Sequence, residues 1–348
     1  MGVILTPIVK RKPIPLKYLY GKSFAVDANH TLYQFLSIIR KADGTPLTDP
    51  EGNVTSHLAG LAFRTSKLLC DFKMRLVFVF DGAPPRLKER ELQRRRALRE
   101  RAMAEWRGAL QRGDLAGAFS KAVSSTRLDR RGIEDAKYLL GALGIPYVQA
   151  PSDAEAQASF MANRGDVWAV ASRDYDSLLY GAPRLVRNLG MQPTEFLPSK
   201  GVLRVLEPEL ISLEDTIELL GISREQLIDL AILVGTDFND GIKGVGPKRA
   251  LRLIGQYGSI DQMPQDIRSG LGDYEIVRSI FLKPEVTEDY NLNYGKVDEQ
   301  RVLRFLCDEK GFSVNRVRLV LDRMRRFHSE LGSKHMTLRD VFQSTPNG

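Results

Sequence analysis

The chain has few cysteines and no long apolar run, and these two absences exclude several classes of protein. Cys70 and Cys307 are the only cysteines in 348 residues, and neither lies in a CxxC or Cys/His pattern. A disulfide-stapled fold, a structural zinc site and thiol chemistry are therefore not expected. The longest apolar runs, such as residues 76–80, are far shorter than the ~18 residues that a membrane-spanning helix needs. Because no apolar signal segment follows the basic residues 10–12, we expect a soluble protein that stays inside the cell.

Acidic residues are too few to balance the basic ones, and the imbalance is local. The chain carries 51 Lys and Arg against 43 Asp and Glu, a formal net charge of +8. Residues 86–131 hold fourteen basic and six acidic residues, which accounts for the whole surplus. The densest part, RLKERELQRRRALRER, lacks proline and glycine and predicts a strongly basic helix. Such concentration of positive charge in one segment favours binding to a polyanion over an ordinary solvated helix.

Short apolar runs alternate with segments of helical spacing, which predicts an α/β fold. Residues 23–27, 75–81 and 167–171 have the composition of buried parallel strands. Helical spacing is present at 30–40 and 57–69, and again at 210–221 and 224–235, where Gly221 and Gly235 are expected to end the helices. We therefore expect a mostly parallel central sheet flanked by helices.

Carboxylates follow several of these strands. Asp27 and Asp81 are placed at the carboxyl ends of parallel strands, where open α/β sheets carry their sites. Two further pairs, Asp153 with Glu155 and Asp174 with Asp176, have the spacing of residues in a helix start or turn. One such aspartate usually serves as a cap. Several at one sheet edge, without cationic neighbours, would repel one another, so they predict bound Mg²⁺ or Mn²⁺ and metal-assisted attack on a phosphodiester.

A second motif, GTDFNDGIKGVGPKRALRLI, predicts a helix-hairpin-helix. Gly244 and Gly246 form a tight turn, after which Pro247 begins a helix. The glycines allow backbone N–H groups to approach a phosphate, and Lys248 and Arg249 add positive charge. Binding through such a motif should be independent of DNA sequence.

These residues carry a family resemblance. The motifs VDANHTLYQFL, TSHLAGLAFRT, FVFDGAPPRLK, APSDAEAQA, ASRDYDSLLYG and LVGTDFNDGIKGVGPKRA resemble, in order, those of the flap endonucleases, structure-specific 5′ nucleases of the XPG family, with archaeal members the most similar. The resemblance implies a PIN-like 5′ nuclease fold with a helical arch. It also implies removal of 5′ flaps from branched DNA in replication and repair, with 5′–3′ exonuclease activity and products that carry a 5′-phosphate and a 3′-hydroxyl.

The same resemblance implies roles for individual residues. One Mg²⁺ would be held by Asp27, Asp81, Asp153 and Glu155, and a second by Asp174, Asp176 and Asp237, a residue that the strand argument does not reach. Lys88 and Arg95 match the arch residues that face the scissile phosphate. Tyr33 matches an aromatic that stacks on a base, Arg64 belongs to the region around the 3′ flap, and a potassium ion is implied at the hairpin.

The resemblance also divides the chain. It implies one nuclease domain over 1–330, composed of an N-terminal region (1–85), the basic arch (86–131), an internal region (132–230), the helix-hairpin-helix (231–260) and a C-terminal helical part (261–330). A flexible tail, 331–348, would contain a weak form of the motif that docks on the replication sliding clamp, with Leu338 and Phe342 as its apolar anchors. Asp153 departs from the family, which usually has glutamate there, and its shorter side chain is expected to reach its metal through water.

Two alternatives remain open at this stage. The chain could be another branch of the family, such as a Holliday-junction resolvase or a repair nuclease, although the short segment between Asp81 and Asp153 argues against the long-insertion repair branch. It could also be a junction-binding scaffold that no longer holds metal. We expect a monomer in the cytoplasm of an archaeal cell, associated with the nucleoid and not with a membrane.

Overall fold

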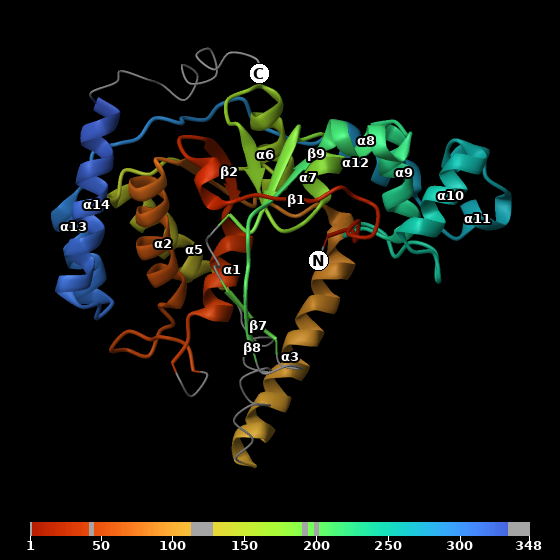
Figure 1. Cartoon of the computed structure of the whole chain (residues 1–348). Coiled ribbons are helices and arrows are strands. Elements are labelled where there is room, and N and C mark those ends of the chain that lie inside the picture. The colour runs from red at the N-terminus through yellow and green to blue at the C-terminus, as the bar shows by residue number, and fades with distance from the viewer. Residues whose placement is uncertain (1, 42–44, 113–127, 190–193, 198–201, 333–348) are drawn as a thin grey trace.

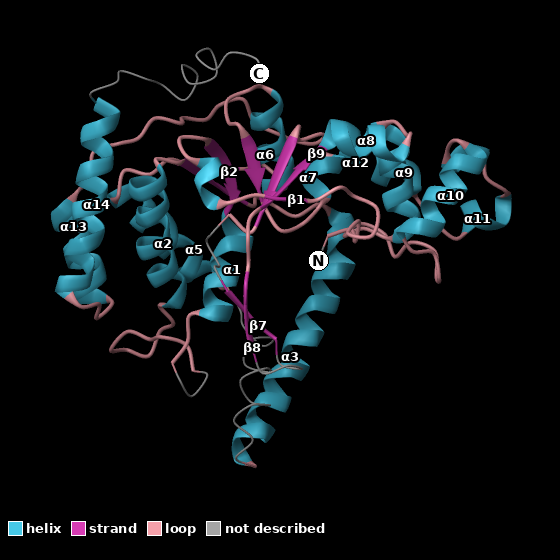
Figure 2. Ribbon diagram, in the orientation of Figure 1, coloured by secondary structure: helices cyan, strands magenta, loops and turns pink. Residues whose placement is uncertain are grey.

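A seven-stranded sheet forms the centre of the molecule, with helices on both of its faces (Figures 1 and 2). The computed structural model describes residues 2–41, 45–112, 128–189, 194–197 and 202–332. In spatial order, the strands of the sheet are β1 (Lys12–Pro13), β9 (Glu209–Ser212), β6 (Arg184–Arg187), β5 (Ala169–Ala171), β2 (Ser23–Asp27), β3 (Arg75–Phe80) and β4 (Tyr147–Gln149).

The middle of the sheet is parallel, as expected. Strands β6, β5, β2, β3 and β4 pair in parallel, while β9 runs antiparallel to both β6 and β1. The register between β2 and β3 runs from Ser23 opposite Arg75 to Asp27 opposite Val79. Parallel strands in register end at one edge of the sheet, so the residues that follow β2 and β3 emerge side by side.

Both faces of the sheet are covered, which explains the uninterrupted apolar strands. Phe24 and Val26 of β2 point into one core, and Ala25 between them points into the other. The first core packs against α1 (Ala28–Ile38), α2 (Ser56–Phe72), α5 (Arg130–Ala142) and α14 (Val314–Gly332). The second packs against α6 (Ala154–Asn163), α7 (Asp176–Leu179), α9 (Arg224–Val234), α10 (Pro247–Tyr257) and α12 (Tyr274–Leu282).

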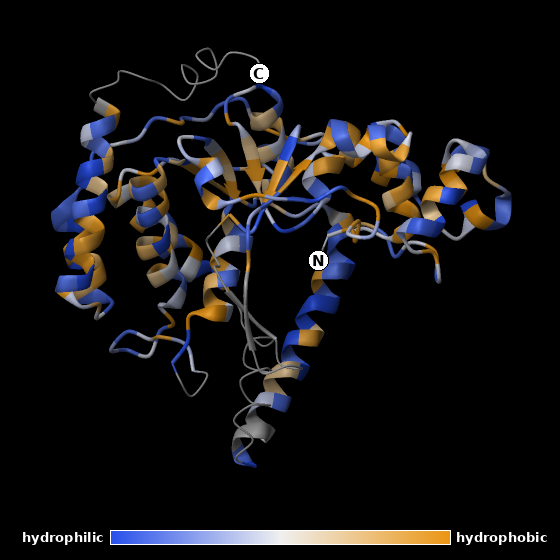
Figure 3. Cartoon of the chain, in the orientation of Figure 1, coloured by the Kyte–Doolittle hydropathy of each residue, from blue (hydrophilic) through white to orange (hydrophobic). Residues whose placement is uncertain are grey.

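The basic segment forms a helix, as predicted. A short 3₁₀ turn, η2 (Arg86–Lys88), leads into α3 (Glu89–Gln111), which has 23 residues and projects from the sheet (Figure 1). In Figure 3 most of this helix is coloured as hydrophilic residues. The rest of the expected arch falls partly on residues 113–127, outside the described part. A two-stranded hairpin, β7 (Thr194–Leu197) and β8 (Val202–Val205), lies outside the main sheet.

One predicted helix begins three residues later than expected. Residues 210–212 were predicted as its start, but they belong to β9, and α8 covers only Leu213–Leu220. The strand forms because these residues pair with the exposed edge of β6, a contact that local helical spacing does not reveal. Ser212 then caps α8 by accepting a hydrogen bond from the Asp215 N–H.

The remaining elements lie at the two ends of the molecule. On one side are α8–α12, including α11 (Gln265–Ser269), and on the other are α14 and α13 (Glu299–Leu303), which continues into a π-helical turn at Arg304–Glu309 (Figure 1). Two further 3₁₀ turns, η1 and η3, cover Leu16–Leu19 and Ile260–Gln262. In the described part of the chain, no helix combines the length and the apolar character needed to cross a membrane.

Candidate active site

The predicted carboxylates meet at the carboxyl edge of the parallel strands. Asp27 is the last residue of β2, and Asp81 directly follows β3. Asp153 and Glu155 lie at the start of α6, which follows β4, and Asp153 is its N-cap. Asp174 lies in the loop after β5, and Asp176, two residues later, begins α7.

Backbone N–H groups hold four of these carboxylates in place. The Oδ1 atom of Asp27 accepts from His30 N–H at 2.9 Å, and that of Asp81 accepts from Ala154 N–H at 2.9 Å. Asp153 and Asp176 accept in the same way, at 3.3 Å and 2.8 Å, from the N–H groups of Glu155 and Val3. Each bond uses one oxygen and leaves the second oxygen of the carboxylate for another partner.

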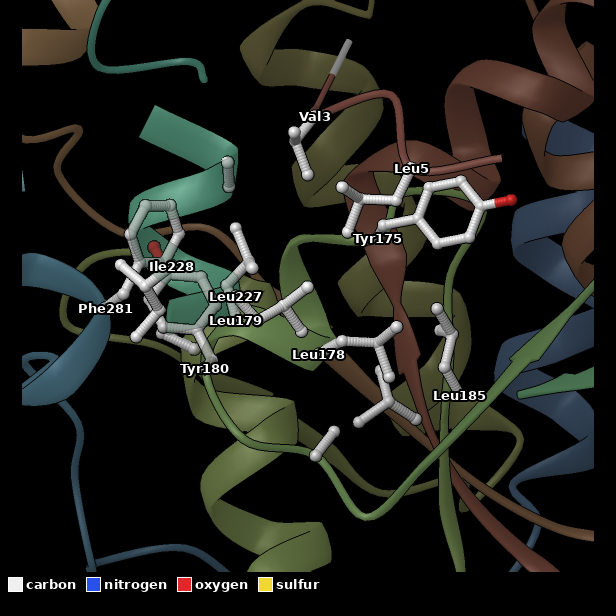
Figure 4. Close-up of a cluster of buried hydrophobic side chains, with 14 of the residues drawn as sticks. Val3, Leu5, Tyr175, Leu178, Leu179, Tyr180, Leu185, Leu227, Ile228 and Phe281 are labelled. Carbon is white, nitrogen blue, oxygen red and sulfur yellow. The ribbon is translucent and has the colours of Figure 1, made fainter. Parts of the chain in front are cut away.

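The segment that begins at Gly2 packs directly on this site. A Cβ atom added to Gly2 would lie 2.5 Å from the Oδ1 atom of Asp176, so any larger residue there would require this carboxylate to move. The next residues are anchored in the core, and Figure 4 shows Val3 and Leu5 among its buried side chains. Gly2 therefore lies against Asp176, one of the clustered carboxylates.

The carboxylates are buried and close together, and both conditions disfavour their charged forms. Burial raises the pKa of Asp27 well above its ordinary value, and the charges of Asp81, Asp174 and Asp153 raise it further. Burial likewise raises the pKa of Asp176 to about 7, with contributions from Asp237 and Asp174.

Glu155 interacts both with the carboxylates around Asp27 and with those around Asp176. Its pKa is raised well above the ordinary value by burial, and then by Asp176, Asp174, Asp27 and Asp153. The seven acidic residues consequently form one electrostatic cluster, in which positive charge would be strongly stabilising.

Two cationic side chains lie directly beside the carboxylates. The Lys88 ammonium donates a short hydrogen bond to Oδ2 of Asp153, and Arg95 donates from Nη2 to both oxygens of Asp237 at 2.7 Å. Although burial lowers the pKa of Lys88, the charges of Asp153, Asp237 and Asp81 outweigh it and raise that pKa above its ordinary value. The turn η2 and helix α3 therefore supply counterions directly to the cluster, and the fold shows which carboxylate each cation contacts.

The donor chemistry of the cluster fits a hard divalent cation. All seven side chains offer carboxylate oxygens, the ligands that Mg²⁺ and Mn²⁺ prefer, and their mutual repulsion would be relieved by such an ion. Within the described residues, no three acidic, histidine or cysteine side chains are already arranged to hold one ion together. Asp153 and Asp237 instead bind Lys88 and Arg95, so ion binding requires these cations to give up their contacts.

Four residues that contact or lie near the carboxylates were not predicted by the sequence analysis. Ser172 and Ser177 donate to Oε1 of Glu155 at 2.6 and 3.3 Å. The Nδ1 atom of His30 lies 3.8 Å from Asp174, although burial lowers the pKa of this histidine. Tyr180 donates its hydroxyl to Asp153. All four flank motif aspartates in sequence, but only the tertiary fold shows which carboxylate each one contacts.

The predicted DNA-binding residues lie outside the carboxylate cluster. Gly244 has a φ of +82°, which favours glycine, and Gly246 is the N-cap of α10. Lys248 and Arg249 are exposed in the first turn of that helix. Tyr33 on α1 and Arg64 on α2 are half-buried. Leu338 and Phe342 lie outside the described residues.

Comparisons with known proteins match most of the chain. The family model of the XPG N-terminal domain matches residues 1–102, and that of the XPG I-region matches residues 144–237. The chain is 49% identical to flap endonuclease 1 of Pyrococcus furiosus, over 99% of this chain and 100% of that protein. It is also 49% identical to flap endonuclease 1 of Pyrococcus abyssi, over 94% of each chain.

Solved structures agree with these matches. Flap endonuclease-1 from Methanococcus jannaschii aligns with a TM-score of 0.76 and 39% identity, covering 94% of this chain and 99% of that one. The catalytic core of Rad2 in complex with DNA substrate aligns with a TM-score of 0.64 and 25% identity, covering 90% and 96%. The two regions matched by family models contain all seven carboxylates, together with Lys88 and Arg95.

Proposed function

The chain belongs to the flap endonucleases of the XPG family, and from this premise we propose that it removes 5′ flaps from branched DNA by two-metal hydrolysis at the carboxylate cluster. It is a metal-dependent nuclease of DNA replication and repair, and 5′–3′ exonuclease activity is part of the proposal. The observation that carries the site assignment is the contact of Lys88, from the turn η2, and of Arg95, from α3, with carboxylates of the cluster.

Two divalent ions would be held by two groups of carboxylates. Asp27, Asp81, Asp153 and Glu155 form the first group, and Asp174, Asp176 and Asp237 form the second. Apart from burial, the pKa of Asp27 is influenced most by Asp81 and that of Asp176 most by Asp237, whereas that of Glu155 is influenced most by Asp176, so Glu155 lies between the two groups. Mg²⁺ suits these oxygen ligands, and Mn²⁺ could substitute. When bound, such ions supply an activated water nucleophile and stabilise charge on the leaving 3′ oxygen.

The chain's own residues would orient and stabilise the phosphate. Lys88 and Arg95 bind carboxylates in this structure, and both are close enough to the cluster to bind a phosphate placed beside it. Transferring their charge to the scissile phosphate would stabilise the negative charge that develops in the transition state. The products would carry a 5′-phosphate and a 3′-hydroxyl.

The surface around the site suits branched DNA. The first turn of α10 presents exposed Lys248 and Arg249 beside the backbone N–H groups of its N-terminus, an arrangement that binds phosphate without reading bases. Tyr33 follows the strand-end Asp27 on α1 and would stack on a base near the cut. Arg64 would contact the 3′-flap side, and a potassium ion at the hairpin belongs to the same proposal.

Removing the hairpin cations should weaken DNA binding without changing the chemistry. A plot of log affinity against log salt concentration has a negative slope, to which each phosphate contact contributes roughly 0.9. We expect a Lys248→Ala/Arg249→Ala variant to reduce the magnitude of this slope by about 2. Fluorescence anisotropy of a labelled double-flap DNA in EDTA, at several salt concentrations, measures this.

The matched control removes two cations from the opposite edge of the sheet. Lys17 precedes β2 and Arg184 begins β6. A Lys17→Ala/Arg184→Ala variant should keep the wild-type salt slope. If both double variants behave alike, the hairpin has no special part in binding duplex DNA.

The proposal includes docking of the tail on the replication sliding clamp, through residues outside the described part. Leu338 and Phe342 are four residues apart, so one helical turn would place both on the same face. His335 and Val341 replace a glutamine and an aromatic of the consensus motif, so we expect binding weaker than the consensus gives.

A Leu338→Ala/Phe342→Ala variant should lose clamp affinity at least ~tenfold, because buried apolar anchors dominate such interfaces. Titration of the clamp into wild type and variant measures this, with cleavage of free flap DNA as the control. Equal clamp affinities, with equal cleavage, would exclude the tail as the docking element.

Cleavage with and without Mg²⁺ separates a nuclease from a junction-binding scaffold. The proposed enzyme cuts double-flap DNA in Mg²⁺ and only binds it in EDTA. A scaffold would bind the junction equally in both buffers and cut in neither. Retention of all seven carboxylates favours the nuclease.

A further inference from the structure

Tyr180 makes a buried contact with one of the proposed metal ligands. It directly follows α7 and is 4% exposed. Its hydroxyl donates to Oδ2 of Asp153 at 3.2 Å, and Asp153 is itself 8% exposed. The tyrosine O–H is the donor and the carboxylate oxygen accepts. The contact therefore fixes Oδ2, while Oδ1 of the same carboxylate caps the helix.

Aromatic packing fixes the position of this hydroxyl. The ring of Tyr180 lies 5.0 Å from that of Phe281 on α12, and Phe281 lies 5.4 Å from Phe238. Figure 4 shows Tyr180 and Phe281 together in the buried cluster. Phe238 follows Asp237 in sequence, and Lys88 Nζ lies 5.2 Å above its ring. The tyrosine thus belongs to a packed unit that reaches both carboxylate groups.

Asp153 has few other contacts that would persist during the reaction. Its Oδ1 atom accepts a long 3.3 Å bond from the Glu155 N–H, and its Oδ2 atom also accepts from Lys88. Under the proposed mechanism, Lys88 leaves Asp153 for the phosphate. Tyr180 would then be the remaining side-chain donor to Oδ2 among these contacts.

We propose that Tyr180 is a positioning residue that holds Asp153 in the orientation needed to bind a divalent ion. The inference rests on the proposed function, which assigns Asp153 to a metal. A carboxylate one methylene shorter than glutamate has less freedom to adjust its reach, so a fixed donor beside it matters. Partners of this kind orient metal ligands, and their loss commonly lowers metal affinity 10–100-fold.

Tyr180→Phe removes the hydroxyl and keeps the ring packing. We expect it to weaken Mn²⁺ binding to the DNA-free protein about tenfold, measured by isothermal titration calorimetry. The Mg²⁺ concentration for half-maximal flap cleavage should rise by a similar factor, while the rate at saturating Mg²⁺ stays within about threefold of wild type.

Tyr294→Phe is the matched control. Its buried hydroxyl also makes hydrogen bonds, to the backbone N–H and carbonyl of Leu76, but no carboxylate is involved. This variant should lower the melting temperature and leave Mn²⁺ affinity unchanged. A purely structural role for Tyr180 would give the same pattern and overturn the inference.

Asp153→Asn separates failure of the inference from failure of the proposed function. If Asp153→Asn leaves Mn²⁺ affinity unchanged, Asp153 holds no metal and the site assignment fails. If Asp153→Asn weakens binding but Tyr180→Phe does not, only the positioning role fails. In the Asp153→Asn background, Tyr180→Phe should have no further effect on half-saturating Mg²⁺, and an additive loss would show that Tyr180 acts elsewhere.

Discussion

Replacing Asp81 or Asp176 by alanine is expected to lower the single-turnover rate of flap cleavage by at least ~10³-fold while leaving junction affinity within about twofold of wild type. The two residues belong to different proposed metal groups, so each change removes a ligand from a different ion. Binding should persist because Lys248 and Arg249 lie outside the cluster. Quench-flow cleavage and anisotropy in EDTA measure the two quantities.

Neither change should unfold the protein. Burial and neighbouring charges already raise the pKa of Asp176 to about 7, so its charged form is disfavoured in the fold. Its removal relieves repulsion but leaves the buried Val3 N–H without its acceptor, so in EDTA the melting temperature of Asp176→Ala should stay close to that of wild type. Asp215→Ala, an exposed change in the first turn of α8, is the control that should cut normally. Wild-type cleavage by either site variant would contradict the assignment.

Lys88→Ala and Arg95→Ala are each expected to slow single-turnover cleavage by ~10²-fold or more, because each removes an electrostatic donor from the transition state. Binding to flap DNA should change little, since the hairpin contacts remain. Arg101→Ala on the same helix is the matched control, because Arg101 is exposed and pairs with Glu105. A tenfold loss of affinity with an unchanged single-turnover rate would mean that these cations only attract DNA.

The contacts of Lys88 and Arg95 with carboxylates add a second expectation. Lys88 occupies Oδ2 of Asp153, so an ion must compete with it. Lys88→Ala should therefore leave Mn²⁺ affinity equal to or higher than that of wild type, measured by calorimetry. Weaker Mn²⁺ binding would make Lys88 a structural support of the site instead.

The location of the site could be predicted from sequence because it depends on strand ends. Apolar runs that end at Asp27 and next to Asp81 indicate parallel strands, and parallel strands bring their carboxyl ends to one edge. Asp237 follows no strand of the sheet, so only the family resemblance assigned it to the site. The contact of Arg95 with Asp237 now connects that residue to the cluster.

Contacts that depend on tertiary packing could not be predicted. Ser172 and Tyr180 differ from other serines and tyrosines only through the carboxylate that the fold places beside them. The predicted start of α8 was wrong for a related reason. Pairing with β6 overrides the helical spacing of residues 210–212. Counterions from Lys88 and Arg95 also required the fold, since both are separated from their partners by more than 60 residues.

Mapping the cut in a double-flap DNA tests the central claim most directly. A substrate labelled at the 5′ end of its flap, incubated with the protein in Mg²⁺ or in EDTA, should give one product in Mg²⁺ and none in EDTA. The account predicts incision one nucleotide inside the downstream duplex, a position that the family resemblance supplies, with a 5′-phosphate on the DNA left behind. Scattered cutting of single strands, cutting that persists in EDTA, or binding without any cutting would contradict it.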